Sequence, residues 1–117
     1  MWIMISGPYR SGSDDPKVWE ENLKRMNEEA YKVFLKGHIP VIGVNMVLPI
    51  IGIAGKELYN ELMMPMSMPL AEHCNAVYRI NGASEGADLE VQHFIDAHKP
   101  IYYSLNEIPS VQSNEHS

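Results

Sequence analysis

The feature of this sequence that most limits its fold is an alternation of short apolar segments with longer segments of helical periodicity. The apolar segments are residues 2–6 (WIMIS), 38–44 (HIPVIGV), 75–80 (NAVYRI) and 100–105 (PIYYSL). Each has the length and composition of a buried strand. Strands that alternate with helices pair in parallel through right-handed crossovers. The sequence therefore predicts an α/β protein, a three-layer α/β/α sandwich with a parallel, Rossmann-like (flavodoxin-like) sheet of four to five strands.

Helical periodicity is clearest directly after the first strand. Asp15 and Pro16 are typical of a helix N-cap and first helical position, and apolar residues then recur at helical spacing as far as Gly37. Further helices are expected over about 55–64, 67–74 and 84–98. The dense apolar residues of the segment 45–55 do not decide between loop and helix.

A chain of 117 residues is long enough for one domain with a buried core. We expect a single domain over residues 1–108 and a flexible, polar tail over residues 109–117. The one cysteine, Cys74, cannot form an internal disulfide and suits a buried structural thiol in a reducing compartment. No segment has the pattern of an export signal or a membrane span, so the sequence predicts a cytoplasmic protein.

The formal net charge of −6 bears on the class of partner. Binding to a nucleic acid polymer normally needs a clustered basic surface, so such a partner is disfavoured. A small anionic ligand held by a few N–H groups is compatible with this charge. The five histidines lack metal-ligand spacing, and we expect no metal site and no cofactor.

Two loops with suitable composition follow predicted strands: SGPYRSG after the first and NGASEG after the third. In open parallel sheets ligands bind outside the carboxyl ends of the strands. Ser84 and Gly86 would begin a helix, where free N–H groups and the helix dipole favour an anion. The alternative is that Ser84 is only an N-cap and the glycines only form turns.

The first loop could supply further donors, from Ser6 and Gly7 and from the guanidinium of Arg10, although a loop arginine is often only solvated. Arg79 is unusual in a strand that both layers cover, and it could pair with Glu90 or Glu72 or face a ligand.

Glu90 lies beside the apolar stripe of the helix predicted over residues 84–98. A helical wheel places it at the edge of this stripe, one turn into the helix, where the dipole favours an ionised carboxylate. An ionised carboxylate at the edge of a cleft can act as a nucleophile on a sugar carbon. It can equally be a boundary glutamate that pairs with a nearby lysine or arginine.

Three segments resemble the nucleoside 2-deoxyribosyltransferase superfamily: MISGPYRSG, AYKVFLKGHIPVIGVN, and CNAVYRINGASEGADLEV followed by HKPIYY. The resemblance covers about residues 2–105, and its most specific part is the S-x-G-x-x-x-E spacing of Ser84, Gly86 and Glu90. In that superfamily the glutamate of this motif attacks the anomeric carbon of a deoxyribose and releases the base. The resemblance therefore implies that Glu90 is the nucleophile.

The resemblance also implies a ligand class and a set of substrate-binding residues. The branch that hydrolyses deoxynucleoside 5′-monophosphates has a serine at the position of Ser84, where transferases acting on free nucleosides have an aspartate. The implied ligand is a small nucleoside or nucleotide, and the implied assembly is a homodimer or larger. The residues expected to hold the substrate are Ser6, Gly7, Tyr9, Arg10, Ser84 and Gly86. Asn45, in the segment 45–55 that is expected to shape the base pocket, is a candidate contact to the base.

The chain departs from the superfamily pattern at two places. The aspartate expected about eight residues before the third strand is absent, and Ser67 stands in this region. The Cys-Asp pair at the start of that strand is replaced by Cys74 and Asn75. Without a general acid the base should leave slowly, unless Glu72 substitutes.

Three hypotheses follow. The leading one is an enzyme that cleaves an N-glycosidic bond through Glu90 and transfers the sugar to water or another base. The alternative is a non-catalytic nucleotide-binding protein of the same fold. The third is an interaction module whose apolar segment 44–68 is an oligomer interface, and Leu89 and the methionine-rich segment 63–68 are predicted interface residues.

Overall fold

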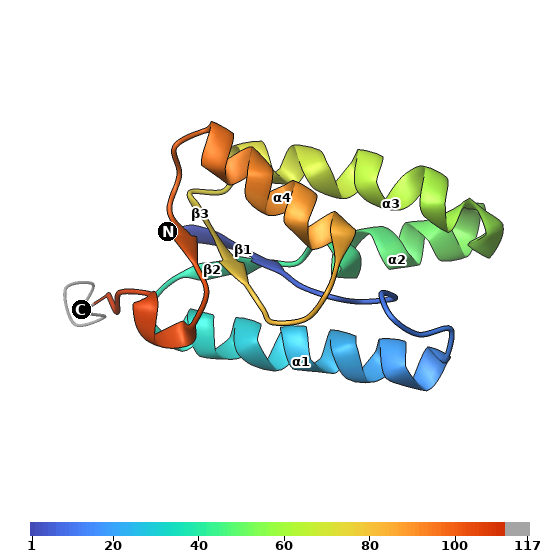
Figure 1. Cartoon of the computed structure of the whole chain (residues 1–117), viewed down its shortest axis with the longest axis horizontal. Helices are drawn as coiled ribbons and strands as arrows, with labels where there is room; N and C mark the ends of the chain where they lie inside the picture. Colours follow the sequence, from blue (N-terminus) through green and yellow to red (C-terminus); the bar gives the residue numbers. More distant parts are fainter. Residues whose placement is uncertain (112–117) are drawn as a thin grey trace.

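The computed structural model describes residues 1–111 and contains one sheet of four parallel strands in the order β2-β1-β3-β4 (Figure 1). The strands are β1 (Trp2–Ser6), β2 (Ile39–Val41), β3 (Ala76–Arg79) and β4 (Ile101–Tyr102). All three pairings are parallel. The predicted α/β class with a parallel sheet is confirmed.

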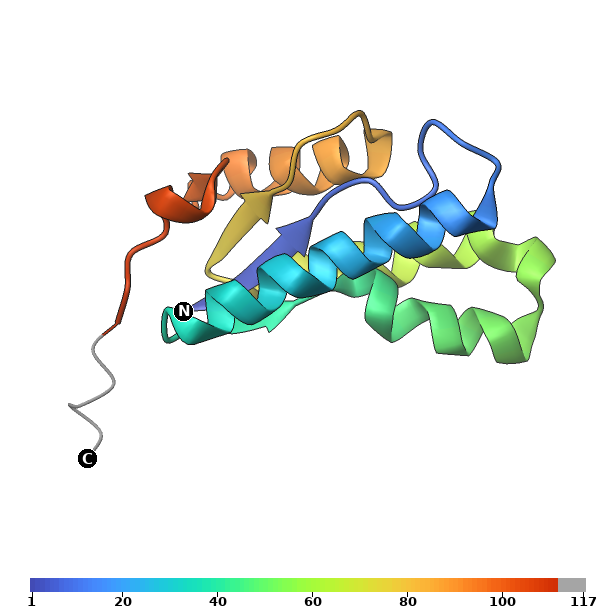
Figure 2. The same cartoon turned by 90° about the horizontal axis from the view of Figure 1, so that it is seen from below.

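Helices cover both faces of the sheet, as Figures 1 and 2 show. Helix α1 (Pro16–Leu35) packs on one face and helix α4 (Glu85–Asp96) on the other. Alternate residues of β1 point to opposite layers, so Ile3 and Ile5 join the core with α1 while Met4 joins the core with α4. This alternation produces the three layers.

Helix α1 begins where the sequence predicts, because Asp15 is its N-cap and accepts a hydrogen bond from the Lys17 N–H at 3.0 Å. Helix α4 likewise begins after its N-cap, Ser84. The local capping residues thus set the start of both sheet-covering helices.

Helices α2 (Gly43–Ala54) and α3 (Tyr59–Ser67) form a hairpin that extends past the carboxyl ends of the strands (Figure 1). A short 3₁₀ turn, Lys56–Leu58, joins them, and Val47, Ile51 and Met63 form a small core between them. At the base of the hairpin a Cβ added to Gly43 would lie 2.6 Å from the Cβ of Ser67, so only glycine allows this close approach.

Several predicted boundaries are wrong. The strand predicted over residues 38–44 ends at Val41, and the undecided segment 45–55 is mostly helix α2. A short apolar run suits a strand or a buried helix equally, and here its residues serve the hairpin core. The helix predicted over residues 67–74 is a 3₁₀ helix, Met68–His73, and the last strand has only two residues.

The ordered chain extends past the predicted domain boundary at residue 108. The Val111 N–H donates to the Lys36 carbonyl at 2.7 Å, and His38 Nε2 lies 2.6 Å from the Pro109 carbonyl oxygen. A third 3₁₀ segment, Leu105–Glu107, follows β4 and precedes these residues. Residues 109–111 are thus anchored, while residues 112–117 of the predicted tail lie outside the described part of the chain. Within residues 1–111 no helix has the length and apolarity needed to cross a membrane.

A partly buried hydrogen bond joins α1 to the sheet. The Tyr78 hydroxyl donates to Glu29 Oε1 at 2.6 Å, and Lys32 Nζ donates to Glu29 Oε2 at 2.8 Å. Burial raises the pKa of Tyr78 and the hydrogen bond to Glu29 raises it further. Burial would raise the pKa of Glu29 too, but the hydrogen bonds from Lys32 and Tyr78 outweigh it and lower that pKa.

We expect Tyr78→Phe to lower the free energy of unfolding by about 2 kcal/mol, because one hydrogen bond to a charged acceptor is lost while Glu29 keeps Lys32. Urea denaturation measures this change. A matched control is Tyr103→Phe, since Tyr103 is 56% exposed and should tolerate the change. Equal loss in both variants would contradict a role for the Tyr78 hydroxyl.

Candidate functional site

A cavity of about 230 Å³ lies at the carboxyl ends of β1 and β3. The chain leaves β1 towards α1 on one face of the sheet and leaves β3 towards α4 on the other, so the cavity occupies the point where the topology switches. Its walls come from the β1–α1 loop, the start of α4 and the α2–α3 hairpin. Six predicted site residues line it: Gly7, Tyr9, Arg10, Ser84, Gly86 and Glu90.

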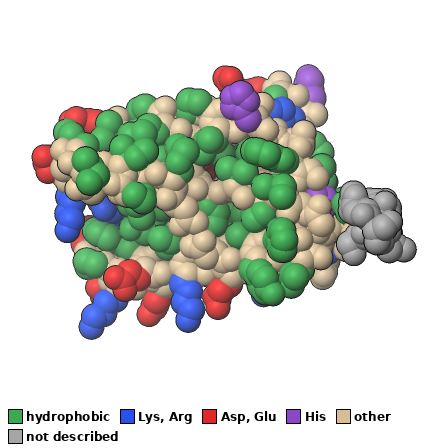
Figure 3. Space-filling model, turned by 180° about the vertical axis from the view of Figure 1, so that it is seen from behind, with side chains coloured by type: hydrophobic (Ala, Val, Ile, Leu, Met, Phe, Trp, Pro, Cys, Tyr) green, Lys and Arg blue, Asp and Glu red, His purple; other side chains and the backbone are tan. Residues whose placement is uncertain are grey.

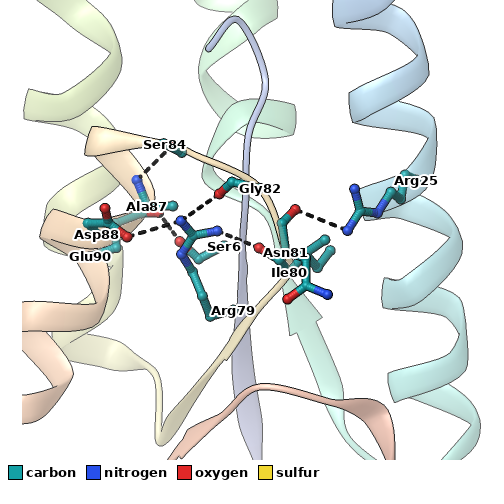
Figure 4. Close-up of polar contacts among 10 residues, drawn as sticks. All are labelled: Ser6, Arg25, Arg79, Ile80, Asn81, Gly82, Ser84, Ala87, Asp88 and Glu90. Atoms are coloured by element: carbon teal, nitrogen blue, oxygen red, sulfur yellow. Dashed lines mark hydrogen bonds and ion pairs between the residues drawn. The ribbon is translucent and has the colours of Figure 1, made fainter. Parts of the chain in front are cut away.

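Glu90 places a partly buried carboxylate in this wall. Ser6, at the end of β1, is 1% exposed and donates a hydrogen bond from its Oγ to Glu90 Oε1 at 2.6 Å (Figure 4). Ser6 is not among the cavity-lining residues. The sequence predicts Ser6 as a substrate contact, but the structure makes it a support that holds the Glu90 side chain.

Burial raises the pKa of Glu90 above the usual glutamate range. The hydrogen bond from Ser6 and the positive charge of Arg79 both lower this pKa, but burial outweighs them. The shift is opposite to the one expected from the helix dipole alone. A carboxyl with a raised pKa and a hydrogen-bonded orientation is typical of a functional site, although structural networks also shift pKa values.

The start of α4 lies beside Glu90 in the cavity wall. Ser84 Oγ accepts a hydrogen bond from the Ala87 N–H at 3.1 Å, and the Ser84 carbonyl accepts one from the Asp88 backbone N–H at 3.0 Å. Ser84 therefore is an N-cap, as the simpler hypothesis holds, and it also lines the cavity. In residues 1–111 no acceptor is assigned to the N–H groups of Glu85 and Gly86, so the first turn has donors to offer an anion.

Arg79 holds the loop between β3 and α4, as Figure 4 shows. Its guanidinium donates to the carbonyl oxygens of Ile80 and, at 2.9 Å, Gly82, and it forms an ion pair with Asp88 at 3.0 Å. Of the alternatives left open by the sequence, the ion pair with Glu90 or Glu72 does not form, because the turn brings Asp88 to the guanidinium instead. Arg79 nevertheless lies close enough to Glu90 to lower its pKa.

Arg10 is enclosed by three aromatic rings at the cavity. Its guanidinium carbon lies 3.6 Å from the ring centroid of Tyr59, 4.3 Å from that of Trp19 and 5.8 Å from that of Tyr9. Arg10 Nε is buried and has no hydrogen-bond partner in residues 1–111. An unsatisfied buried donor is costly, so this nitrogen can be satisfied by a ligand or by water.

Three residues considered at the sequence level lie away from the cavity. Asn45 is exposed on α2, exchanges hydrogen bonds with Asn27 of α1 at 2.8 and 3.4 Å, and does not line the cavity. Glu72 is exposed and is not a lining residue, so it cannot replace the missing acid in this conformation. Asn75 lies at the other end of β3 and accepts a hydrogen bond from the Trp2 N–H at 2.8 Å.

The sequence analysis missed the contribution of α3. Tyr59, Asn60, Met63 and Met64 line the cavity, together with Ser67, which is 3% exposed. The methionine-rich segment is therefore mostly cavity wall and hairpin core rather than free surface. No local pattern reveals this, because the cavity exists only once the hairpin folds back over the sheet.

Cys74 is buried, and burial raises the pKa of its thiol, in keeping with a structural role. In the described residues, no three His, Cys, Asp or Glu side chains gather as a possible metal site.

Gly82 is the tightest point of the loop that carries Ser84 towards α4. Its φ is +124°, and an added Cβ would lie 2.6 Å from Pro8 Cγ in the β1–α1 loop. We expect Gly82→Ala to lower the free energy of unfolding by about 2 kcal/mol, through backbone strain and this clash. Chemical denaturation measures the loss.

Gly12→Ala is the matched control, because Gly12 has φ +83° but nothing within 4 Å of an added Cβ. It tests backbone strain alone and should cost less than Gly82→Ala. Equal costs would mean that the contact with Pro8 is unimportant.

The fold and cavity together define a parallel α/β protein with a cavity of polar and apolar lining residues at the switch point of its sheet. Comparison with protein-family models, with curated proteins and with solved structures gives no match.

Proposed function

We propose that the protein cleaves the N-glycosidic bond of a nucleoside or deoxynucleoside, free or as its 5′-monophosphate, with Glu90 as the nucleophile. The observation that carries the proposal is the Glu90 carboxylate in the cavity wall, oriented by Ser6 at 2.6 Å beside the start of α4. The resemblance to the nucleoside 2-deoxyribosyltransferase superfamily supports it, because Ser84, Gly86 and Glu90 of the shared motif line one cavity.

The proposed reaction has two displacements. The Glu90 carboxylate forms an ester bond to C1′ of the sugar while the C1′–N bond breaks, and the base leaves with the bonding electron pair and takes a proton from solvent. Water or a second base then attacks C1′ and releases Glu90. Only the ionised carboxylate is nucleophilic, so the reaction needs a pH above the raised pKa of Glu90.

A monophosphate is the favoured substrate form. The free amides at the start of α4 suit a phosphate, and Arg10 offers a nearby guanidinium with an unsatisfied Nε. The base would then lie towards α3, where Met63 and Met64 offer apolar contacts. The single cysteine suits a reducing compartment, and we place this activity in the cytoplasm.

One observation favours the alternative, a nucleotide-binding protein without useful turnover. In the described residues, Glu90 is the only carboxylate that lines the cavity. Ser67, the last residue of α3, lines the cavity in the region where the superfamily has an aspartate. Within residues 1–111 no second acidic side chain lies at the cavity to protonate the leaving base, and the lack of such an acid removes a contribution of roughly 10²–10⁴-fold to the rate.

The test is release of free base from nucleosides and their 5′-monophosphates by the wild type, Glu90→Ala and Glu85→Ala. Glu85 is an exposed glutamate on the same helix and does not line the cavity, so it is a matched control. We expect release by the wild type and Glu85→Ala and none by Glu90→Ala. No release by the wild type, with a melting temperature raised by monophosphates, would support the nucleotide-binding protein instead. If the wild type neither releases base nor gains thermal stability from monophosphates, both hypotheses are rejected.

A further inference from the structure

The cavity offers few groups that could give a proton to a leaving base. Within residues 1–111 the titratable side chains that line it are Tyr9, Arg10, Tyr59 and Glu90. Glu90 is the proposed nucleophile and must be ionised to react. A guanidinium does not release its proton in proteins, so Arg10 can donate hydrogen bonds but cannot act as an acid. The two phenols are therefore the remaining proton donors among these side chains.

Tyr59 is a weak acid in this cavity. A phenol ordinarily ionises near pH 10, well above the pH at which a general acid works best near neutrality. Burial raises the pKa of Tyr59 further and outweighs the opposing effect of the Arg10 charge. The Tyr59 ring packs on Arg10, with the guanidinium carbon 3.6 Å from the ring centroid, and the Tyr9 ring lies 6.3 Å from it in the same enclosure. These rings position Arg10 rather than protonate a base.

The α2–α3 hairpin brings no acid to the cavity from outside its wall. Helix α2 contains no charged residue, and Figure 3 shows hydrophobic side chains over much of the side on which α2 lies, with charged side chains towards its borders. Glu57 and Glu61 of the hairpin are exposed and do not line the cavity. The Glu57 carboxylate lies against Gly55, at the turn that joins α2 to α3.

A base that already carries a positive charge needs no such acid. When the C1′–N bond of a cationic base breaks, the bonding electron pair neutralises the ring and the base leaves uncharged. A neutral base leaves as an anion unless it is protonated. We propose that the substrate is an N-glycoside of a cationic base, such as an N7-alkylated purine or a pyridinium ring. This inference rests on the proposed function and adds the class of its leaving group.

The reaction of such a substrate balances with one carboxylate. The Glu90 carboxylate forms an ester bond to C1′ as the C1′–N bond breaks, and no proton moves in this step. Water then attacks C1′, the Glu90 carboxylate leaves with the electron pair of the ester bond, and the proton of the attacking water passes to solvent.

The lining of the cavity is compatible with a cationic ring. The charges of Arg10 and Glu90 are opposite, so the lining side chains carry no net charge. In the proposed reaction Glu90 is the charge nearest to C1′ and attracts the ring, while Arg10 serves the phosphate. Met64 Sδ lies 3.3 Å from the position of a Cβ added to Gly86, so a polarisable sulfur faces the start of α4. Thioether sulfur makes favourable contacts with aromatic rings.

The test compares two pairs of 5′-monophosphates, each in its ribose and 2′-deoxyribose forms. 7-Methylguanosine monophosphate is compared with guanosine monophosphate, and nicotinamide mononucleotide with uridine monophosphate. The pairs thus test a two-ring and a one-ring base with and without the ring charge. We expect kcat/KM, after subtraction of uncatalysed release, to be about 100-fold or more higher for the cationic member, since a general acid contributes at least about this factor to release of a neutral base.

Ser67→Asp tests the cause of this preference. Ser67 is 3% exposed in the α3 wall, towards which the base is proposed to lie, and burial favours the protonated form of an aspartate there. We expect the new acid to speed release of neutral bases and narrow the ratio about 10-fold or more, whereas Ser67→Ala should not narrow it. Asn60→Asp is a second acid variant in the same wall, at an exposed residue and with almost no change in size. Thermal melting establishes that the variants fold.

The outcomes separate this inference from the proposed function. Release of both members of a pair at equal rates, abolished by Glu90→Ala, would overturn the inference and leave the proposed function intact. Release of neutral bases alone would do the same. A ratio that neither acid variant narrows would show that a missing acid does not set it, and would also overturn the inference. Release from none of the substrates, or release that persists in Glu90→Ala, would reject the proposed function and the inference with it.

Discussion

Glu90→Gln is expected to reduce base release on the order of 10³-fold or more while making the folded protein more stable at neutral pH. Loss of the nucleophile removes the covalent step, and single losses of this kind have effects of at least that size. The amide has nearly the same shape, so it can still accept the hydrogen bond from Ser6. The stability gain comes from removing a charge that burial disfavours.

The direction of this stability effect depends on pH. Burial raises the pKa of Glu90 in the folded state above 4.5, the value taken for the unfolded chain. The protonated carboxyl is therefore favoured by folding, and its contribution to stability is fully present below pH 4.5. It is lost as the pH rises through the folded-state pKa, where the wild type must keep a buried charge and the glutamine variant need not.

Melting curves of the wild type and Glu90→Gln from acidic to neutral pH measure this difference. The two melting temperatures should coincide below about pH 4.5 and separate above it, with the variant higher. Glu85→Gln is the control, because Glu85 is exposed and should show no such separation. A Glu90→Gln variant that is less stable at neutral pH would mean that the carboxylate is stabilised in the folded state.

The parts of the fold that the sequence predicts are those with local signals. Asp15 and Ser84 are N-caps in both the prediction and the structure, because a capping side chain acts within three residues of its own position. The two loops that leave β1 and β3 meet at one cavity, because parallel strands bring their carboxyl ends to the same edge.

The parts that the sequence does not predict depend on long-range packing. The aromatic enclosure of Arg10 joins Trp19 of α1 and Tyr59 of α3. No spacing relates these residues, so only the folded hairpin reveals the enclosure. Asn45 was predicted to contact the base because the sequence does not give the bounds of α2. Without these bounds, the exposed position of Asn45 on that helix cannot be predicted.

The contacts that support Glu90 also depend on the folded geometry. Arg79 precedes Asp88 by nine residues, and the choice of Asp88 over Glu90 as its ion-pair partner depends on the geometry of the Gly82 turn. Ser6 is 84 residues from Glu90 in sequence, and only the pairing of β1 with β3 brings them together.

Arg79→Met should lower the free energy of unfolding by about 3 kcal/mol and raise the pKa of Glu90 further. The variant loses the hydrogen bonds to the Ile80 and Gly82 carbonyls, which leaves two carbonyls in the β3–α4 turn without this donor, and it loses the ion pair with Asp88. It also removes a positive charge that lowers the pKa of Glu90. Urea denaturation measures the first effect, and carbon NMR titration of the Glu90 carboxyl, assigned with Glu90→Gln, measures the second.

Arg25→Met is the control that shows whether these effects are specific to Arg79 or would follow from the loss of any arginine near the turn. Arg25 of α1 donates to the Asn81 carbonyl at 3.0 Å, in the same turn, but this contact is exposed. Its loss should cost no more than about 1 kcal/mol and leave the carboxyl titration of Glu90 unchanged. Equal effects of the two variants would show that the turn is stabilised by hydrogen-bond donors to its carbonyls from either arginine. They would also show that the buried charge of Arg79 does not lower the pKa of Glu90. A larger effect of Arg79→Met on both measurements would mean that one guanidinium both shapes the turn and sets the pH at which Glu90 becomes ionised.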